Sequence, residues 1–298
     1  MILNEDTIRG LLHLDELIGV MAGALADLSA GKVEQPVRVI VPVTEYQGFF
    51  GVMPAYGPAL GAKLVTFYPN NHGMDTHHAI IVLFKPETGE PLVTMDGRLI
   101  TEMRTAAVSA VATNLLARRQ ASVLAILGTG VQARSHLQAL RRIRQFDETR
   151  VWSPRHARAF ADDFGVHAAV SAEEAVRGAD VVVVATAATT PVLRGAWLSP
   201  GTHINAVGAV RPNWRELDDD VLHASRIFVE SRAAALHESG DVIAASEISA
   251  EIGEVVAGTQ PGRRSDQEIT LFKSVGVAVE DIAAADLVYR NALRAQTS

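Results

Sequence analysis

Cysteine is missing altogether from this chain of 298 residues. Its absence excludes a disulfide framework, a catalytic thiol, a thiolate-held iron–sulfur cluster and a zinc site built on cysteine. An excess of basic charge is missing too, because the formal net charge is −7. A nucleic-acid surface needs a basic face. We therefore expect neither thiol chemistry nor a nucleic-acid partner.

Long hydrophobic runs are also lacking. No apolar stretch approaches the roughly 18 residues of a membrane span, and residues 1–6 hold none of the basic residues that open a signal peptide. Apolar residues still make up 48% of the chain and charged residues 20%, which is usual for a globular protein with a large core. The expectation is a soluble, cytoplasmic enzyme with no membrane partner.

Candidate strands dominate the first hundred residues, after one predicted helix over residues 15–30 that ends at Gly31. Short runs that alternate between apolar and polar residues are typical of half-buried strands. A turn at residues 85–90 joins the last two runs and predicts a hairpin. The predicted strands cover residues 36–43, 49–53, 62–68, 79–84 and 91–95.

From residue 105 onward helices and strands alternate, beginning with a predicted helix over residues 105–119. This alternation predicts a parallel sheet covered on both faces. The four valines from Val181 to Val184 suit a strand buried on both sides. The predicted strands cover residues 123–127, 150–152, 166–170, 181–185, 204–207 and 227–229, and a final helix covers 272–293.

The expected fold class is α/β, a Rossmann-type doubly wound parallel sheet plus a strand-rich α+β domain. We place the strand-rich domain at residues 1–103 and the Rossmann domain at residues 104–276. Residues 277–298 could pack back on the first domain and complete it.

A glycine motif follows the first predicted strand of the second domain. The strand 123–127 runs into Gly128-Thr129-Gly130-Val131-Gln132-Ala133 and then into an amphipathic helix. Gly128 permits a tight turn, Gly130 lets the backbone approach a pyrophosphate, and Ala133 allows close helix–strand packing. The helix N-terminus offers N–H groups to the phosphates. The alternative is an ordinary tight turn, but the strand before and the helix after favour dinucleotide binding.

The end of the next strand distinguishes NAD from NADP. NAD-binding domains usually place an acidic residue there to hold the ribose 2′-hydroxyl, and here the sequence is Trp152-Ser153-Pro154-Arg155-His156. Ser153 can donate to a 2′-phosphate, and Arg155 can pair with it as a planar fork. We expect NADPH rather than NADH, unless Arg155 and Arg158 only form a solvated helix face.

Three cations of the first third lie where charge is costly. Lys63 interrupts an apolar strand, Arg38 interrupts a valine-rich one, and Arg104 opens a predicted helix, where it would oppose the macrodipole by about 0.3–1 kcal/mol. Such charges need partners. A substrate carboxylate would serve all three, at about 1.5–3 kcal/mol for each charge-assisted hydrogen bond. The alternative is internal ion pairing with Glu45, Asp75, Asp96 or Glu102.

Histidines 72, 77 and 78 suggest a metal site at first sight. Adjacent residues of a strand point to opposite faces, so His77 and His78 could not easily share one ion. We expect no metal and a polar contact for His77.

With these residues in hand, the chain resembles the ornithine cyclodeaminase/μ-crystallin family over nearly its whole length. The resemblance implies a homodimer built through the first domain, which would also bind a small carboxylate substrate, and a nicotinamide domain in the middle of the chain. The stretches that carry it are residues 51–56, 63–68, 95–97, 104–110, 126–133, 203–209, 238–241 and 272–276.

The resemblance also implies roles for single residues. Arg38, Lys63 and Arg104 match positions that hold the substrate carboxylate, and Lys63 and Arg104 are the candidate catalytic residues. Arg211 and Glu238 match the edge of the ligand pocket. Besides Gly128, the residues that match or neighbour cofactor positions are Thr76, His77, Arg104, Gly130, Val131, Gln132, Ser153, Arg155, Thr186, Val207 and Ser274.

One departure from the family pattern bears on the reaction. Cyclodeaminases carry a proton-transferring aspartate soon after the glycine that follows the fifth strand, and here that stretch holds Val210, which cannot exchange a proton. The run from Arg211 to Leu217 is more similar to μ-crystallin and the cyclic ketimine reductases.

The predicted function is therefore NADPH-dependent reduction of cyclic ketimine carboxylates, such as Δ1-pyrroline-2-carboxylate or Δ1-piperideine-2-carboxylate, to proline or pipecolate. Three alternatives stay open: ornithine cyclodeaminase with tightly held NAD, an alanine dehydrogenase-like enzyme, and a small-ligand or structural protein that keeps the fold without catalysis.

Overall fold

The computed structural model describes residues 1–297, which form two compact units. The first unit comprises Met1–Arg104 and the segment from Gly276 onward, and the second comprises Thr105–Val275.

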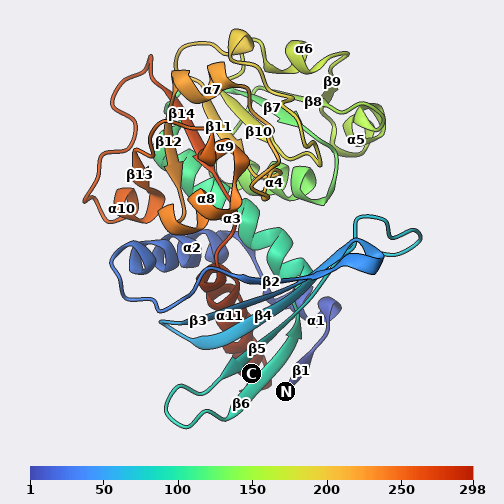
Figure 1. The fold of residues 1–298 in the computed structure, drawn as a ribbon, viewed down its shortest axis with the longest axis vertical. Coiled ribbons are helices and arrows are strands. Elements are labelled where there is room, and N and C mark those ends of the chain that lie inside the picture. The colour runs from blue at the N-terminus through green and yellow to red at the C-terminus, as the bar shows by residue number, and fades with distance from the viewer. Residues whose placement is uncertain (298) are drawn as a thin grey trace. The chain divides into compact units, whose positions relative to one another are not determined.

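A six-stranded sheet, in the order β1-β6-β5-β4-β3-β2, forms the frame of the first unit (Figure 1). Strands β2 to β6 are antiparallel to their neighbours, and β1 pairs parallel with β6. Helix α11 packs on β3, β4 and β5, and α2 packs on α11. The elements are β1 (Ile2–Leu3), α1 (Glu5–Leu11), α2 (Leu14–Ser29), β2 (Val39–Val43), η1 (Thr44–Tyr46), β3 (Gly48–Tyr56), β4 (Leu60–Phe67), β5 (His77–Phe84), β6 (Pro91–Asp96) and α11 (Ala278–Thr297).

The two faces of this sheet differ in burial, as the alternating sequence predicts. Met53, Lys63 and Ile81 stand opposite one another in register, and each is at most 2% exposed. Val39 and Ile80 belong to the other face and are 55% and 45% exposed. All five predicted strands of this region form, and β5 and β6 make the predicted hairpin.

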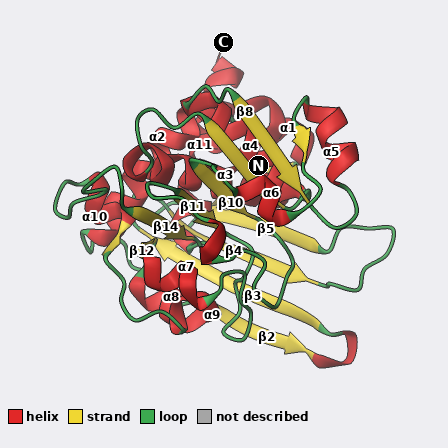
Figure 2. Ribbon diagram, turned by 90° about the horizontal axis from the view of Figure 1, so that it is seen from above, coloured by secondary structure: helices red, strands yellow, loops and turns green. Residues whose placement is uncertain are grey.

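An eight-stranded parallel sheet forms the frame of the second unit, in the order β13-β12-β14-β11-β10-β7-β8-β9 (Figure 1). Figure 2 shows β12, β14, β11 and β10 of this sheet from above. Helix α4 packs on β7 and β10, and α6 packs on β7 and β8. The predicted Rossmann-type α/β fold is confirmed. The elements are α3 (Arg98–Leu116, which begins in the first unit), β7 (Val123–Leu127), α4 (Val131–Ile143), β8 (Glu148–Trp152), α5 (Ala157–Phe164), β9 (His167–Ala168), α6 (Ala172–Val176), β10 (Val181–Val184), η2 (Gly195–Trp197), β11 (His203–Ala206), α7 (Asp219–Ala224), β12 (Ser225–Val229), α8 (Arg232–Glu238), α9 (Gly240–Ile243), β13 (Ala250–Glu251), α10 (Ile252–Val256) and β14 (Ile269–Lys273).

The predicted helix over residues 272–293 is wrong at its start. Phe272 and Lys273 end strand β14, where Phe272 pairs with Asn205 on one side and Phe228 on the other. Helix α11 begins only at Ala278, after Gly276 has turned the chain with φ +73°. A central strand of a parallel sheet is apolar on both faces, so its sequence carries no alternation that separates it from a buried helix.

The start of helix α3 also differs from the prediction. The helix begins at Arg98 rather than Thr105, because the Asp96 side chain accepts a hydrogen bond from the Arg98 backbone N–H at 2.8 Å. Arg104 therefore lies in the second turn of the helix. The expected opposition of its charge to the helix N-terminus is wrong, since that effect fades within the first turn; burial is what makes the Arg104 charge costly.

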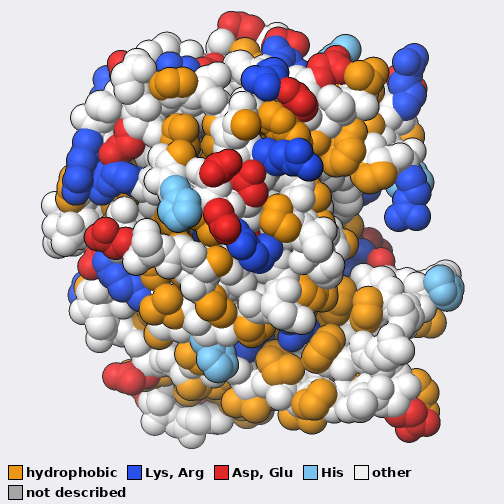
Figure 3. Space-filling view, turned by 45° about the horizontal axis from the view of Figure 1, so that its top comes forward, with side chains coloured by type: hydrophobic (Ala, Val, Ile, Leu, Met, Phe, Trp, Pro, Cys, Tyr) orange, Lys and Arg blue, Asp and Glu red, His pale blue; other side chains and the backbone are white. Residues whose placement is uncertain are grey.

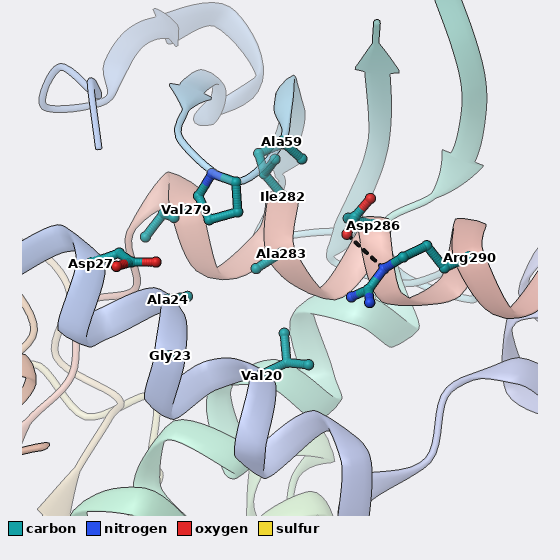
Figure 4. A pocket seen from close by; sticks show the side chains of 11 residues that line it. Val20, Gly23, Ala24, Asp27, Ala59, Val279, Ile282, Ala283, Asp286 and Arg290 are labelled. Atoms are coloured by element: carbon teal, nitrogen blue, oxygen red, sulfur yellow. Dashed lines mark ion pairs between the residues drawn. The ribbon is translucent and has the colours of Figure 1, made fainter. Parts of the chain in front are cut away.

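A cavity of about 170 Å³ lies between α2 and α11, beside the β3–β4 turn (Figure 4). Gly23 and Ala24 of α2 and Ala283 of α11 line it, and these small side chains leave it open. A Cβ added at Gly23 would meet no atom within 4 Å.

We expect Gly23→Ala to stabilise the protein by about 1 kcal/mol, because alanine is the better helix former and the added methyl enters open space. Chemical denaturation measures this free energy of unfolding. Gly31→Ala is the matched control: Gly31 has φ +70°, so the same methyl should destabilise there. Equal effects at the two positions would contradict the prediction.

Within residues 1–297, no helix is long and apolar enough to cross a membrane. Acidic and basic side chains are interspersed over the face shown in Figure 3.

Candidate active site

The glycine loop joins β7 to α4 in the second unit. Gly128 has φ +116°, and a Cβ there would clash with the Ala185 carbonyl oxygen. Gly130 is the N-cap residue of α4, and a Cβ added there would meet no atom within 4 Å. Within residues 1–297, no side chain caps this helix N-terminus by a hydrogen bond. Ala133 is fully buried. The first N–H groups of α4 are thus open to an anion, and the loop fits the pyrophosphate of a dinucleotide. Val131, at 43% exposure, and Gln132 form the first turn.

The end of β8 lies beside this loop. The Ser153 hydroxyl is 3.2 Å from the Thr129 hydroxyl and accepts the His156 N–H at 3.0 Å. Arg155 is exposed in the turn before α5. Arg158 instead lies within α5 and forms an exposed ion pair with Asp162 at 3.3 Å. Arg155 and Arg158 therefore do not belong to one helix face.

Three more predicted cofactor residues follow neighbouring strands. Thr186, Val207 and Ser274 come directly or closely after β10, β11 and β14, which lie side by side in the sheet. Ligands of doubly wound sheets bind at these carboxyl ends. The Ser274 hydroxyl donates to Glu230 at 2.5 Å, and Thr186 is bonded to Glu216 through its N–H and its hydroxyl.

The two residues expected at the edge of a ligand pocket also lie in the second unit. Arg211 is half-buried in the loop after β11, and Glu238 is the last residue of α8, 7% exposed. The Gly240 N–H donates to the Arg211 carbonyl oxygen at 3.0 Å, so the loop carrying Arg211 is fastened to the end of α8.

The first unit brings the three predicted cations together around the start of α11. Lys63 Nζ is 2.6 Å from Asp281 Oδ2, and Arg104 Nε is 3.0 Å from Asp281 Oδ1. Arg104 Nη1 is also 2.6 Å from Glu280 Oε2. Arg38 donates to the carbonyl oxygen of Gly276. We call Arg38, Lys63, Arg104, Glu280 and Asp281 the cation cluster.

Internal ion pairing does occur here, and two of its carboxylates are Glu280 and Asp281. Asp75 pairs with Arg98 at 3.4 Å, and Asp96 accepts the Arg98 N–H. Glu280 and Asp281 were not predicted as partners because they come more than 170 positions after Arg104. A sequence pattern could have indicated them, because two adjacent acidic residues interrupt an otherwise apolar helix, as Lys63 interrupts an apolar strand.

Charge and burial determine the chemistry of the cation cluster. It places three cations beside two fully buried carboxylates. Burial lowers the pKa of Lys63 from 10.5 to about 8, although Asp281 opposes the shift. Burial would raise the pKa of Asp281, but Arg104 and Lys63 hold it below its usual value. Ammonium and guanidinium groups placed in this way can hold a carboxylate by charge-assisted hydrogen bonds.

Thr76 and His77 lie at the start of β5. The Thr76 carbonyl oxygen accepts the Tyr68 N–H at 2.7 Å. Burial and the Lys63 charge lower the pKa of His77 to about 4, so its ring is neutral at pH 7. His77 is half-buried and His78 is exposed. Among residues 1–297, no group of histidine, aspartate and glutamate has metal-binding geometry.

The family model named ornithine cyclodeaminase/mu-crystallin family matches residues 1–296. The chain belongs to this family. The rat protein named ketimine reductase mu-crystallin is 49% identical over 301 residues, which cover 96% of this chain and 96% of that protein. The resemblance predicted from the sequence is confirmed.

Two solved structures of the family are closely similar. One is Δ1-pyrroline-2-carboxylate reductase of Thermococcus litoralis in complex with NADH and L-proline, which is 39% identical with a TM-score of 0.95 and covers 99% of this chain and 98% of that one. The other is an archaeal alanine dehydrogenase dimer with bound NAD, 36% identical with a TM-score of 0.94, covering 99% and 97%.

Proposed function

We propose that this member of the ornithine cyclodeaminase/mu-crystallin family reduces cyclic ketimine carboxylates with NADPH, forming proline from Δ1-pyrroline-2-carboxylate or pipecolate from Δ1-piperideine-2-carboxylate. The observation that carries the proposal is the cation cluster, which brings Arg38, Lys63 and Arg104 together around the start of α11. The names of the rat and Thermococcus litoralis relatives support the same reaction class.

The substrate carboxylate is assigned to Arg38, Lys63 and Arg104. Glu280 and Asp281 orient two of these cations by ion pairs of 2.6–3.0 Å, so the donors are fixed before an anion arrives. Such preorganisation leaves less side-chain entropy to be lost on binding. Arg211 and Glu238, which lie in the second unit, are assigned to the edge of a ligand pocket.

Lys63 has a second role in this proposal. Its pKa of about 8 lies close to neutral pH, where a general acid is most effective. The Thr101 hydroxyl, 3.4 Å from Lys63 Nζ, also faces the ammonium group. Lys63 either orients the substrate carboxylate or delivers a proton to the imine, and Arg104 helps to hold the reactants in place.

The nicotinamide cofactor is assigned to the loop and strand ends of the second unit. Gly128, Gly130, Val131 and Gln132 would hold its pyrophosphate at the start of α4, because that helix N-terminus is open to an anion. When bound, the reduced nicotinamide supplies a hydride. The other residues assigned to cofactor contacts are Thr76, His77, Arg104, Ser153, Arg155, Thr186, Val207 and Ser274.

The choice of NADPH rests on Ser153 and Arg155. Within residues 1–297 the guanidinium of Arg155 has no ion pair, which leaves its planar fork available to a 2′-phosphate. The two solved structures hold NADH and NAD, so a comparison of the KM values for NADPH and NADH tests this assignment.

We expect Arg155→Ala to raise the KM for NADPH about 10- to 150-fold, because one charge-assisted contact of roughly 1.5–3 kcal/mol is lost. The KM for NADH should hardly change, because NADH lacks the 2′-phosphate. Steady-state kinetics with both cofactors measure this. Arg158→Ala is the control, since it removes another exposed arginine, which lies in α5. Equal effects of Arg155→Ala on both cofactors would contradict the NADPH assignment.

We assign substrate binding and a homodimer interface to the first unit. We assign NADP binding to the second unit. The partly exposed face of the six-stranded sheet presents Val39, Val41 and Ile80 at 45–55% exposure. An apolar face of this kind is typical of an interface, and the archaeal relative is a dimer. The molar mass in solution tests the assignment, and a monomer would overturn it.

The absorbance of NADPH in the near ultraviolet tests the reaction itself. Rapid NADPH oxidation with either cyclic ketimine carboxylate, without ammonia release from ornithine, is the expected result and ranks the two ring sizes. Ammonia from ornithine without NADPH consumption would overturn the proposal and favour a cyclodeaminase, in which Val210 would need a substitute proton carrier.

A further inference from the structure

Glu216 is a fully buried carboxylate of the second unit that receives four hydrogen bonds. Its Oε1 accepts the Thr186 N–H at 2.9 Å and the Thr186 hydroxyl at 2.7 Å. Its Oε2 accepts the N–H groups of Gly208 at 2.7 Å and Ala209 at 3.0 Å. One side chain thus fastens two separate loops, which follow β10 and β11.

The backbone around Glu216 is itself held in place. Its carbonyl oxygen accepts the N–H groups of Val192 and Leu193 at 2.9 and 3.0 Å. The Asp241 side chain accepts the N–H groups of Glu216 and Leu217 at 3.1 and 3.2 Å. The buried Lys273 ammonium is 3.4 Å from Asp241 and 3.9 Å from Glu216, so one cation faces both carboxylates.

The two loops approach each other as closely as their atoms allow. A Cβ at Gly208 would clash with the Thr186 carbonyl oxygen and with the Glu216 carboxylate. The loops stand at the carboxyl ends of adjacent strands β10 and β11, where ligands of doubly wound sheets bind. Thr186 and Val207, both assigned to cofactor contacts, lie within or beside the bonded segments.

We propose that Glu216 is a positioning residue for the nicotinamide cofactor, holding the loops after β10 and β11 at the separation that the cofactor requires. This inference rests on the proposed function, because that function assigns Thr186 and Val207 to the cofactor. Glu216 acts through the two loops rather than by touching the reacting atoms.

This positioning role requires both carboxylate oxygens of Glu216 to accept hydrogen bonds. Every contact of the Glu216 side chain is with a donor, so a carboxylate satisfies all four. An amide of the same shape presents one NH2 group. Turned toward Gly208 and Ala209, that group faces two N–H donors; turned toward Thr186, it faces the Thr186 N–H, since only the hydroxyl there can accept. Glutamine at position 216 therefore loses hydrogen bonding to one of the two loops, while the side-chain volume and the surrounding packing stay the same.

The test is the affinity of purified Glu216→Gln for NADPH and NADH, measured by quenching of tryptophan fluorescence without substrate. We expect the Kd of both cofactors to rise roughly tenfold or more, the loss of about one hydrogen bond to a charged acceptor. Glu247→Gln, the same change at an exposed position, should leave the Kd unchanged. An unchanged Kd in folded Glu216→Gln would overturn the proposal.

Amide hydrogen exchange in the cofactor-free protein gives a second readout. The amides of Thr186, Gly208 or Ala209 should exchange faster in Glu216→Gln, while amides in the strands keep their rates. If this variant does not fold, Glu216→Asp carries both measurements, because it keeps the charge beside Lys273 but withdraws the carboxylate by one methylene. Unchanged protection of all three amides would contradict the proposal.

Neither measurement needs turnover, so the inference and the proposed function fail separately. Wild-type protein that binds NADPH but leaves cyclic ketimines unreduced would overturn the proposed function alone.

Discussion

Lys63→Met should lower kcat with a cyclic ketimine carboxylate about 100- to 10,000-fold, the range for loss of a general acid. Methionine keeps most of the side-chain volume inside the buried sheet face but can neither donate a proton nor carry charge. The effect is expected in kcat if Lys63 delivers the proton, and in KM if it only holds the carboxylate.

The pH profile tests whether Lys63 takes part in the reaction in either role. The lysine must be protonated both to donate a proton and to hold the carboxylate, so wild-type kcat/KM should fall as the pH rises through about 8. That limb should be absent in Lys63→Met. Lys85→Met is the control, since Lys85 is exposed in the β5–β6 turn. Near-normal turnover of Lys63→Met would reject Lys63 as a participant in the reaction.

Arg104→Met should both destabilise the protein and weaken substrate binding. Glu280 and Asp281 are fully buried, and removing their guanidinium partner leaves buried charge uncompensated, at a cost of about 3–5 kcal/mol. The KM for the ketimine should rise about 10- to 150-fold, because one charge-assisted hydrogen bond to the carboxylate is lost.

A double variant distinguishes binding from stability. Arg104→Met with Glu280→Gln removes one charge of each sign, so the free energy of unfolding measured with denaturant should recover most of the loss. The KM should stay high, because the donor to the substrate is still missing. Recovery of KM together with stability would show that Arg104 serves the fold alone.

Local patterns predicted the parts of the site that depend on neighbouring residues. The strand–loop–helix unit around Gly128 was predicted because turn, helix start and close packing are each encoded within a dozen residues. Lys63 and Arg38 were singled out because a charge in an apolar run is costly wherever its partner lies.

What could not be predicted depends on pairing across the chain. Strand β14 lies between β11 and β12, and nothing in its own five residues records those neighbours. Asp281 meets Lys63 only because α11 returns to the sheet of the first unit. Glu216 was read as part of a motif, whereas its four hydrogen bonds come from loops up to 30 positions away.

The return of α11 has a consequence for how the protein is made. The Gly276 carbonyl oxygen and the Asp281 carboxylate accept hydrogen bonds from Arg38 and Arg104, which lie 238 and 177 positions earlier in the chain. During synthesis the meander β2–β6 leaves the ribosome before α11, so the apolar face that also holds Lys63 stays uncovered until the intervening unit has been translated. Contacts of such long sequence separation slow folding, and an uncovered sheet in the meantime is a target for aggregation. Helix α11, which supplies the ion-pair partners of Lys63 and Arg104, thus also covers the sheet and ends the period in which it can aggregate.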